Sequence, residues 1–199
     1  LTYNNINARR QHLRPEIRVH GIITDGGQAP NVVPERAAVR YYVRALDRPY
    51  LDEVVARVKN CARAGALATG AEVEITSLAK LENRLNVETL NRLVIENARD
   101  AGARRIKPHP ASLGSADFGN VTHAMPAATL YVEVPPEGVP WHTAEMAEAA
   151  GGESGHRAVL IGAKAMAWTA YDIFTQPELL EQMRQEFAAA KASGQPMEG

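Results

Sequence analysis

The chain has 199 residues, of which 45% are hydrophobic and 23% are charged, and its formal net charge is -1. This composition is typical of a soluble globular protein and leaves no excess of positive charge to attract nucleic acid or an anionic membrane. The single cysteine, Cys61, cannot form an internal disulfide, and no apolar run reaches the ~18 residues of a membrane helix. We therefore expect a cytoplasmic protein without a membrane span or a nucleic-acid partner.

The first residues have the pattern of a helix that has already begun. Tyr3, Ile6 and Leu13 recur at roughly helical spacing, and the chain starts at Leu1 with no capping residue before them. This pattern predicts that the beginning of the polypeptide is missing.

Residues 1–80 predict a small α+β domain. Apolar and polar residues alternate over 16–24 and over 35–46, and an Asp-Gly-Gly turn follows the first run, which indicates two antiparallel strands. An apolar stripe predicts a helix over 50–67, and alternation returns over 71–78 as a third strand. With a leading strand restored, this order is that of a ferredoxin-like βαββαβ sandwich.

Residues 81–199 predict part of an α/β layer, with too few strands for a complete sheet. The expected elements are a helix over 87–101, a Gly/Ser-rich loop over 114–120, an apolar strand over 128–134, a helix over 153–174 and a last helix from Pro177.

Two histidines are candidate functional residues. The alternation places His20 on the strand face opposite Val19, with Arg40 and Arg44 expected nearby, where its imidazole could donate a hydrogen bond to a developing oxyanion. An ordinary surface histidine is the alternative. His142 enters a helical segment just after an apolar strand, where it could bind zinc with Glu145 or Glu148 one turn away, or simply cap the helix.

The Gly/Ser-rich loop is a candidate ligand-binding segment. Its small residues and backbone donors suit close approach to a ligand, and Ser115 or Asp117 could hydrogen-bond a substrate, although a plain turn fits equally well. The loop lacks the pattern of a phosphate-binding loop, and the chain has no nucleophile elbow. Cys61 falls within the predicted helix over 50–67, where packing is the simpler role.

Four segments together resemble one enzyme family. They are RVHGIITDGGQAPNVVPERAAVRYYVRA, GSADFGNV, PWHTAEMAEAAG and AKAMAWTAYDIFTQPELLEQMRQEF. In this order they are similar to the zinc-dependent aminoacylase and carboxypeptidase-type amidohydrolases, in the branch of p-aminobenzoyl-glutamate hydrolases and Xaa-Arg or β-alanyl-lysine dipeptidases. The resemblance runs over nearly the whole chain.

The resemblance implies a fold and an activity. Members of the family combine a di-zinc α/β catalytic domain with an inserted ferredoxin-like lid that also forms a homodimer. This chain resembles the lid, over residues 1–80, followed by the C-terminal part of the catalytic domain. The implied reaction is hydrolysis of the amide bond of a small N-acyl amino acid or dipeptide by a zinc-activated water.

The resemblance also implies roles for individual residues. His20 corresponds to the lid histidine that reaches a neighbouring subunit's active site and polarises the scissile carbonyl. His142 corresponds to the last metal ligand. Substrate contacts are implied for the lid and for the Gly/Ser-rich loop, at Asn31, Gly114, Ser115 and Asp117.

The sequence departs from the family at its metal site. The His-x-Asp motif, the bridging aspartate and the Glu-Glu pair that includes the general base come from the family's N-terminal half, and none occurs in this chain. In a complete enzyme zinc lowers the pKa of its bound water while a glutamate moves the proton. We therefore expect this chain alone to bind zinc poorly and to be inactive.

Two other functions are compatible with the sequence. The chain could act as a non-catalytic dimerisation or binding module derived from the family. A ferredoxin-like sheet that presents Arg36, Arg40, Tyr42 and Arg44 could also stack RNA bases. The balanced net charge and the absence of an RNP-type segment argue against RNA binding.

Overall fold

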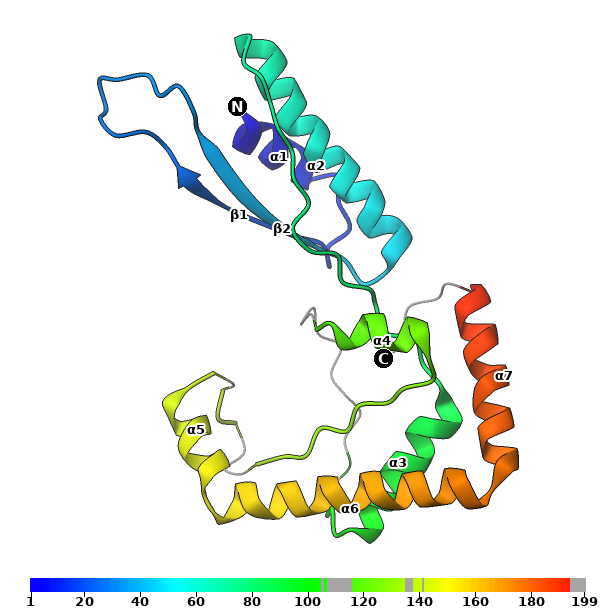
Figure 1. The fold of residues 1–199 in the computed structure, drawn as a ribbon. Coiled ribbons are helices and arrows are strands. Elements are labelled where there is room, and N and C mark those ends of the chain that lie inside the picture. The colour runs from blue at the N-terminus through cyan, green and yellow to red at the C-terminus, as the bar shows by residue number, and fades with distance from the viewer. Residues whose placement is uncertain (105, 107–115, 135–137, 141, 194–199) are drawn as a thin grey trace. The chain divides into compact units, whose positions relative to one another are not determined.

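A computed structural model describes residues 1–104, 106, 116–134, 138–140 and 142–193. The described residues form two compact units, residues 1–83 and the described residues from Arg84 onward (Figure 1). The sequence predicted a boundary at residue 80, and the structure divides the chain after Asn83. In the described part of the chain, no helix has the length and apolar character needed to cross a membrane.

The first unit packs helices on one face of a β-hairpin. Its elements are α1 (Thr2–Arg10), β1 (Arg18–Asp25), β2 (Ala38–Arg44) and α2 (Arg48–Thr69). Figure 1 shows α1 and α2 side by side along the hairpin. Their shared core consists of Ile6, Ile17, Val19 and Val54, and Cys61 packs against it, as the sequence predicted.

The hairpin register determines which residues share a face. β1 and β2 pair antiparallel, with Val19 opposite Val43 and His20 opposite Tyr42. Residues directly opposite in such a pair point to the same side. Val19 is 1% exposed and faces the helices, so His20 lies on the other, open face of the sheet.

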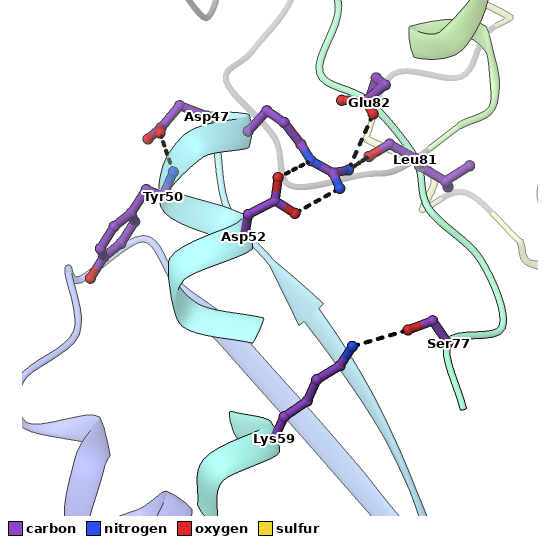
Figure 2. Close-up of polar contacts among 8 residues, drawn as sticks. Asp47, Tyr50, Asp52, Lys59, Ser77, Leu81 and Glu82 are labelled. Atoms are coloured by element: carbon purple, nitrogen blue, oxygen red, sulfur yellow. Dashed lines mark hydrogen bonds and ion pairs between the residues drawn. The ribbon is translucent and has the colours of Figure 1, made fainter. Parts of the chain in front are cut away.

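Local signals determine both ends of α2. The Asp47 side chain accepts a hydrogen bond from the Tyr50 backbone N–H at 2.9 Å, which caps the first turn (Figure 2). Gly70 ends the helix in a left-handed conformation with φ 71°. The helix predicted over 50–67 is therefore extended by about half a turn at each end.

The third strand predicted over 71–78 does not form. Among the described residues of this unit only β1 and β2 pair, and 71–83 follow α2 without regular secondary structure. Lys59 Nζ donates to Ser77 Oγ at 3.3 Å and holds this segment beside α2 (Figure 2). Alternation of apolar and polar residues is compatible with a strand, but a strand also needs a neighbouring strand whose backbone pairs with it by hydrogen bonds.

Arg48 of α2 contacts the C-terminal end of segment 71–83. Its guanidinium binds the Asp52 carboxylate through two hydrogen bonds of 2.7 and 3.0 Å and also donates to the Leu81 carbonyl at 3.3 Å. Glu82 Oε1 lies 3.4 Å from Arg48 Nη1 and forms a further ion pair with it (Figure 2). The hydrogen bond from Arg48 lowers the pKa of Asp52 below its usual 3.8.

The described part of the second unit is built from helices. They are α3 (Glu88–Asp100), α4 (Phe118–Ala124), α5 (Ala144–Gly151), α6 (Glu153–Thr175) and α7 (Pro177–Ser193). α3 packs against both α6 and α7, around a core of Val87, Leu90 and Met183.

Two predictions for this unit differ from the structure. Residues 128–134 form no strand among the described residues, although Leu130, Val132 and Val134 alternate in burial with exposed neighbours. Val132 of this segment lies close to α6: a Cβ built on Gly162 of that helix would be 3.9 Å from Val132 Cγ2. The predicted loop over 114–120 is also partly wrong, since Phe118 already begins α4.

Polar contacts tie α3 to its two neighbours. Asn97 donates to Thr169 Oγ1 at 3.2 Å and to Asp172 Oδ2 at 2.9 Å on α6. On the other side, the Glu186 carboxylate of α7 accepts from the Thr89 backbone N–H at 2.9 Å and from Thr89 Oγ1 at 2.6 Å. Glu186 therefore caps the N-terminus of α3 from a helix far away in sequence.

Candidate functional site

His20 is exposed in the middle of β1, on the open face of the hairpin. Tyr42 lies directly opposite, Ile22 pairs with Arg40, and Arg18 pairs with Arg44. Arg40 and Arg44 are therefore the diagonal neighbours of His20, as the alternation predicted. We call this surface the open sheet face; it consists of Arg18, His20, Ile22, Arg40, Tyr42 and Arg44.

The open sheet face is cationic. It contains three arginines and no acidic residue, because the one carboxylate of the two strands, Asp25, lies at the end of β1. Arg18 is already engaged, since its guanidinium donates to the Pro15 and Ile17 carbonyls at 2.7 and 2.9 Å. Arg40 is exposed and is available to pair with a carboxylate.

The backbone beside His20 is held from the opposite face. A Cβ on Gly21 would overlap the ring of its cross-strand partner Tyr41, so only glycine fits beneath that ring. Tyr41 in turn packs on Tyr3 of α1, with ring centroids 5.2 Å apart. Burial raises the pKa of Tyr41 far above its usual value. These contacts pack the strand that carries His20 against α1.

Asn31, the second predicted residue of the lid, lies apart from His20. It is exposed in the connection between β1 and β2, beyond the Asp25–Ala38 end of the ladder. A turn hydrogen bond from Val32 N to Ala29 O at 3.2 Å shapes this connection. The paired residues of β1 from His20 to Asp25 lie between His20 and Asn31 along the hairpin.

Asp117 is the part of the predicted substrate loop that the structure describes. It is exposed at the N-cap position of α4, and its side chain makes no capping hydrogen bond. The other two predicted residues of this loop, Gly114 and Ser115, lie outside the described residues. The Asp117 carboxylate is therefore presented at a helix start without serving as its cap.

A cluster next to Asp117 was not singled out from the sequence. The Arg84 guanidinium lies over the rings of Phe118 and Tyr131, 5.8 and 5.7 Å from their centroids, and donates to the Tyr131 hydroxyl at 2.8 Å. Its members are too distant in sequence for a local pattern to connect them. The cluster fixes the start of α4 and so positions Asp117.

His142 has an unusual backbone. With φ 65°, it is the one described residue other than glycine in the left-handed region, a conformation that histidine tolerates better than most residues but at some cost. It is exposed and lies two residues before α5, whose first turn is capped by Thr143 through a 3.2 Å hydrogen bond from Met146 N. Thr143, and not His142, therefore caps this helix.

The surroundings of His142 in sequence are acidic. Residues 116–156 contain several Asp and Glu residues but no Lys or Arg, which favours a cation over an anion. Glu145 and Glu148 are exposed on α5. No group of three or more His, Cys, Asp or Glu side chains that could hold a metal ion occurs among the described residues. The described residues thus do not form a zinc site by themselves.

The predicted site residues that the structure describes belong to two different units. His20 and Asn31 belong to the first unit, and Asp117 and His142 belong to the second.

Comparison with known proteins identifies the family. No family model matches the sequence. The Xaa-Arg dipeptidases of Homo sapiens and Mus musculus are 38% and 37% identical to it over 94% of this chain. A p-aminobenzoyl-glutamate hydrolase chain of Escherichia coli (strain K12) is 23% identical over 90% of this chain. These matches cover 44% of each dipeptidase and 49% of the bacterial hydrolase chain, so the chain spans about half the length of its relatives.

These relatives are the proteins that the four sequence segments resemble, and the match extends over nearly the whole chain. The chain therefore belongs to the family of amidohydrolases and dipeptidases that includes the Xaa-Arg dipeptidases and the p-aminobenzoyl-glutamate hydrolases.

Proposed function

We propose that this chain is the lid and the C-terminal catalytic part of a metal-dependent amidohydrolase that cleaves the amide bond of a dipeptide or an N-acyl amino acid. The observation that carries the proposal is the 38% identity to an Xaa-Arg dipeptidase over 94% of this chain. In this proposal the rest of the catalytic domain lies in polypeptide outside the 199 residues. In this proposal the 199 residues alone are inactive.

His20 is proposed to stabilise the oxyanion. In amide hydrolysis water adds to the carbonyl carbon, negative charge develops on its oxygen, and the C–N bond breaks as the nitrogen takes a proton. An exposed imidazole on a strand can donate a hydrogen bond to that oxygen. The proposal places His20 in the active site of the partner subunit of a homodimer formed through the lid.

Arg40 is proposed to select the substrate. It lies diagonal to His20 on a face without carboxylates, so a substrate carboxylate there would meet a guanidinium and no like charge. A dipeptide with a free C-terminal carboxylate fits this arrangement. One of the compared relatives is named for Xaa-Arg dipeptides and another for p-aminobenzoyl-glutamate, and both substrates carry a carboxylate.

His142 is proposed to be one zinc ligand, and Asp117, with Gly114, Ser115 and Asn31, to line the substrate pocket. The acidic character of residues 116–156 supports a cation near His142. A catalytic zinc site needs three protein ligands, so the other ligands come from outside the described residues.

The test uses the complete polypeptide that the gene encodes, purified and assayed with Xaa-Arg dipeptides and with p-aminobenzoyl-glutamate. We expect hydrolysis that is lost with a chelator and restored by zinc. His20→Ala should lower kcat at least ~100-fold, as for an oxyanion donor, and leave the metal content and the oligomeric state unchanged. His12→Ala, at another exposed histidine of the first unit, is the matched control. Full activity of His20→Ala would refute the assigned role.

A second candidate is a non-catalytic dimerisation or binding module. The observation in its favour is a group of exposed apolar side chains near the far end of the hairpin: Ile22, Ile23, Val32, Val33 and Val39. In that case the 199-residue chain should dimerise by itself at micromolar concentration in sedimentation. A monomer there, together with zinc-dependent hydrolysis by the complete polypeptide, would favour the enzyme.

A further inference from the structure

The open sheet face carries two large side chains that are neither charged nor buried. Tyr42 is 63% exposed and Ile22 is 61% exposed. The solvated face of an antiparallel sheet normally carries polar residues, since its apolar residues point to the core. The other members of this face, His20 and the three arginines, follow that rule. Tyr42 and Ile22 depart from it immediately beside the proposed oxyanion donor.

The register places these side chains on two crossing diagonals. His20 is opposite Tyr42, and Ile22 is opposite Arg40 on the next pair along the same face. His20 and Arg40 therefore form a polar diagonal, while Tyr42 and Ile22 form an apolar one. Side chains of this length reach across such a diagonal. A molecule bound by both His20 and Arg40 must lie against Tyr42 and Ile22.

The Tyr42 ring is open to a ligand. No described residue stacks on it, whereas Tyr41, its neighbour on the other face, packs on Tyr3. Arg18, a diagonal neighbour of Tyr42, instead donates to the Pro15 and Ile17 carbonyls. The ring is therefore available to contact a group from outside the chain.

The covalent structure of a dipeptide determines which of its side chains reaches this ring. The scissile carbonyl belongs to the first residue and the free carboxylate to the second, and these two groups are ~5 Å apart. Diagonal positions in a sheet are ~7–8 Å apart, so His20 and Arg40 can bind one dipeptide together. The second residue then lies over the crossing of the two diagonals, and its side chain starts from there.

We propose that Tyr42, assisted by Ile22, is the platform that binds the C-terminal side chain of the substrate. The enzyme then selects dipeptides whose second residue has a long hydrocarbon stem or a planar group. The proposal rests on the proposed function, which places His20 and Arg40 on the substrate. An aromatic face binds hydrocarbon, other rings and guanidinium groups, whereas glycine leaves the face in water. The Xaa-Arg dipeptides for which two relatives are named end in such a side chain.

The test compares two substrates that differ only in this side chain. The complete polypeptide that the gene encodes is assayed with an Xaa-Arg and an Xaa-Gly dipeptide that share their first residue. Tyr42→Ala should raise KM for the Xaa-Arg dipeptide at least ~5-fold, with kcat within ~2-fold, because it removes binding common to ground state and transition state. KM for the Xaa-Gly dipeptide should stay unchanged.

Two further variants separate the ring from general damage. Tyr42→Phe keeps the aromatic face and should keep the KM of the unmodified enzyme for the Xaa-Arg dipeptide. Ile22→Ala should raise that KM less than Tyr42→Ala does. Partial unfolding or loss of a dimer would lower kcat for both dipeptides, so the difference between the two substrates reports the platform alone.

Two kinetic results would overturn the proposal: an unchanged KM for the Xaa-Arg dipeptide in Tyr42→Ala, or an equal rise for both dipeptides. Hydrolysis of neither dipeptide by the unmodified polypeptide would refute the proposed function instead. Titration calorimetry with the same two dipeptides then decides about Tyr42. Tighter binding of the Xaa-Arg dipeptide that is lost in Tyr42→Ala supports the platform, whereas equal binding of both dipeptides, or no binding, overturns it.

Discussion

The two units expose opposite kinds of surface. The first unit covers one face of its hairpin with helices and leaves a cationic face open around His20. The second unit packs α6 and α7 on α3 and leaves large apolar side chains of α6 exposed: Val159, Leu160, Met166, Tyr171 and Phe174. A polar open face is compatible with water and suits a ligand, whereas an apolar open face stabilises the fold only when it is covered. The first surface is therefore compatible with a polar ligand, and the second with an apolar packing partner.

The largest effect is expected from a substitution that destabilises the second unit and leaves the first unit folded. A Cβ on Gly155 would overlap the Ala150 carbonyl where α5 joins α6, and backbone cannot move aside as a side chain can. Gly155→Ala should therefore lower the free energy of unfolding of this unit by about 3 kcal/mol or more. Urea unfolding followed by tryptophan fluorescence measures it, because Trp168 lies on α6 of the second unit.

Gly151→Ala is the matched control for that experiment, because nothing lies within 4 Å of a Cβ at this position. Amide hydrogen exchange in β1 and β2 should stay unchanged in both variants, since the first unit is compact by itself. Equal stability of the two glycine variants would show that α5 and α6 do not meet as closely as the structure has them.

The next effect is on the first unit. Gly21→Ala would push the Tyr41 ring away from its contact with Tyr3 and should cost about 2 kcal/mol of unfolding free energy. Gly26→Ala, whose Cβ would be 3.4 Å from Ile23 Cγ2, an ordinary contact, is the control. Because His20 neighbours Gly21, we also expect its NMR chemical shifts to change in the first variant. An unaffected His20 would contradict the support that Tyr41 gives to this strand.

The elements that sequence reasoning located depend on local periodicity. Alternation identified β1 and β2 and the diagonal placement of Arg40 near His20, because a period of two fixes the face of every residue in a strand. Apolar stripes located α2 and α3 for the equivalent reason in helices.

The remaining features depend on partners that local patterns do not reveal. Residues 71–78 and 128–134 alternate as strands do, yet no ladder forms among the described residues, because pairing is a property of two segments. The contact of Arg84 with Tyr131, like the capping of Thr89 by Glu186, joins residues far apart in sequence. For the predicted site, sequence spacing placed His20 and His142 on their elements, but their roles came from resemblance.

A smaller effect is expected from weakening the contact between α3 and α7. Burial opposes ionisation of Glu186, but hydrogen bonds, chiefly those from Thr89, and a nearby positive charge together outweigh it and lower the pKa of Glu186 below its usual 4.5. A lowered folded-state pKa stabilises the fold above the unfolded-state value and loses that contribution as pH falls through and below about 4.5. Glu186→Gln should therefore cost about 1.5 kcal/mol at pH 7, and its difference from the unmodified chain should shrink towards pH 3.

Glu181→Gln is the control for this variant. Glu181 is exposed on the same helix and accepts a hydrogen bond only from Gln185, one turn away, at 3.1 Å. Thermal unfolding at several pH values measures both variants. A constant difference between Glu186→Gln and the unmodified chain across pH 3–7 would mean that the charge of Glu186 does not contribute to the cap.

The smallest expected effect has the opposite sign and belongs to the first unit. The Tyr41 hydroxyl is buried without a hydrogen-bond partner among the described residues, and leaving a buried polar group unpaired is unfavourable. Tyr41→Phe should therefore stabilise the chain by about 0.5 kcal/mol. Because burial holds the pKa of Tyr41 above its usual 10.0, its neutral form favours the fold below pH 10, and that contribution is lost as pH rises beyond it. Denaturant unfolding at pH 7 and pH 10.5 should show a larger advantage of the variant at the higher pH, and Tyr42→Phe, on the open sheet face, is the control at pH 7.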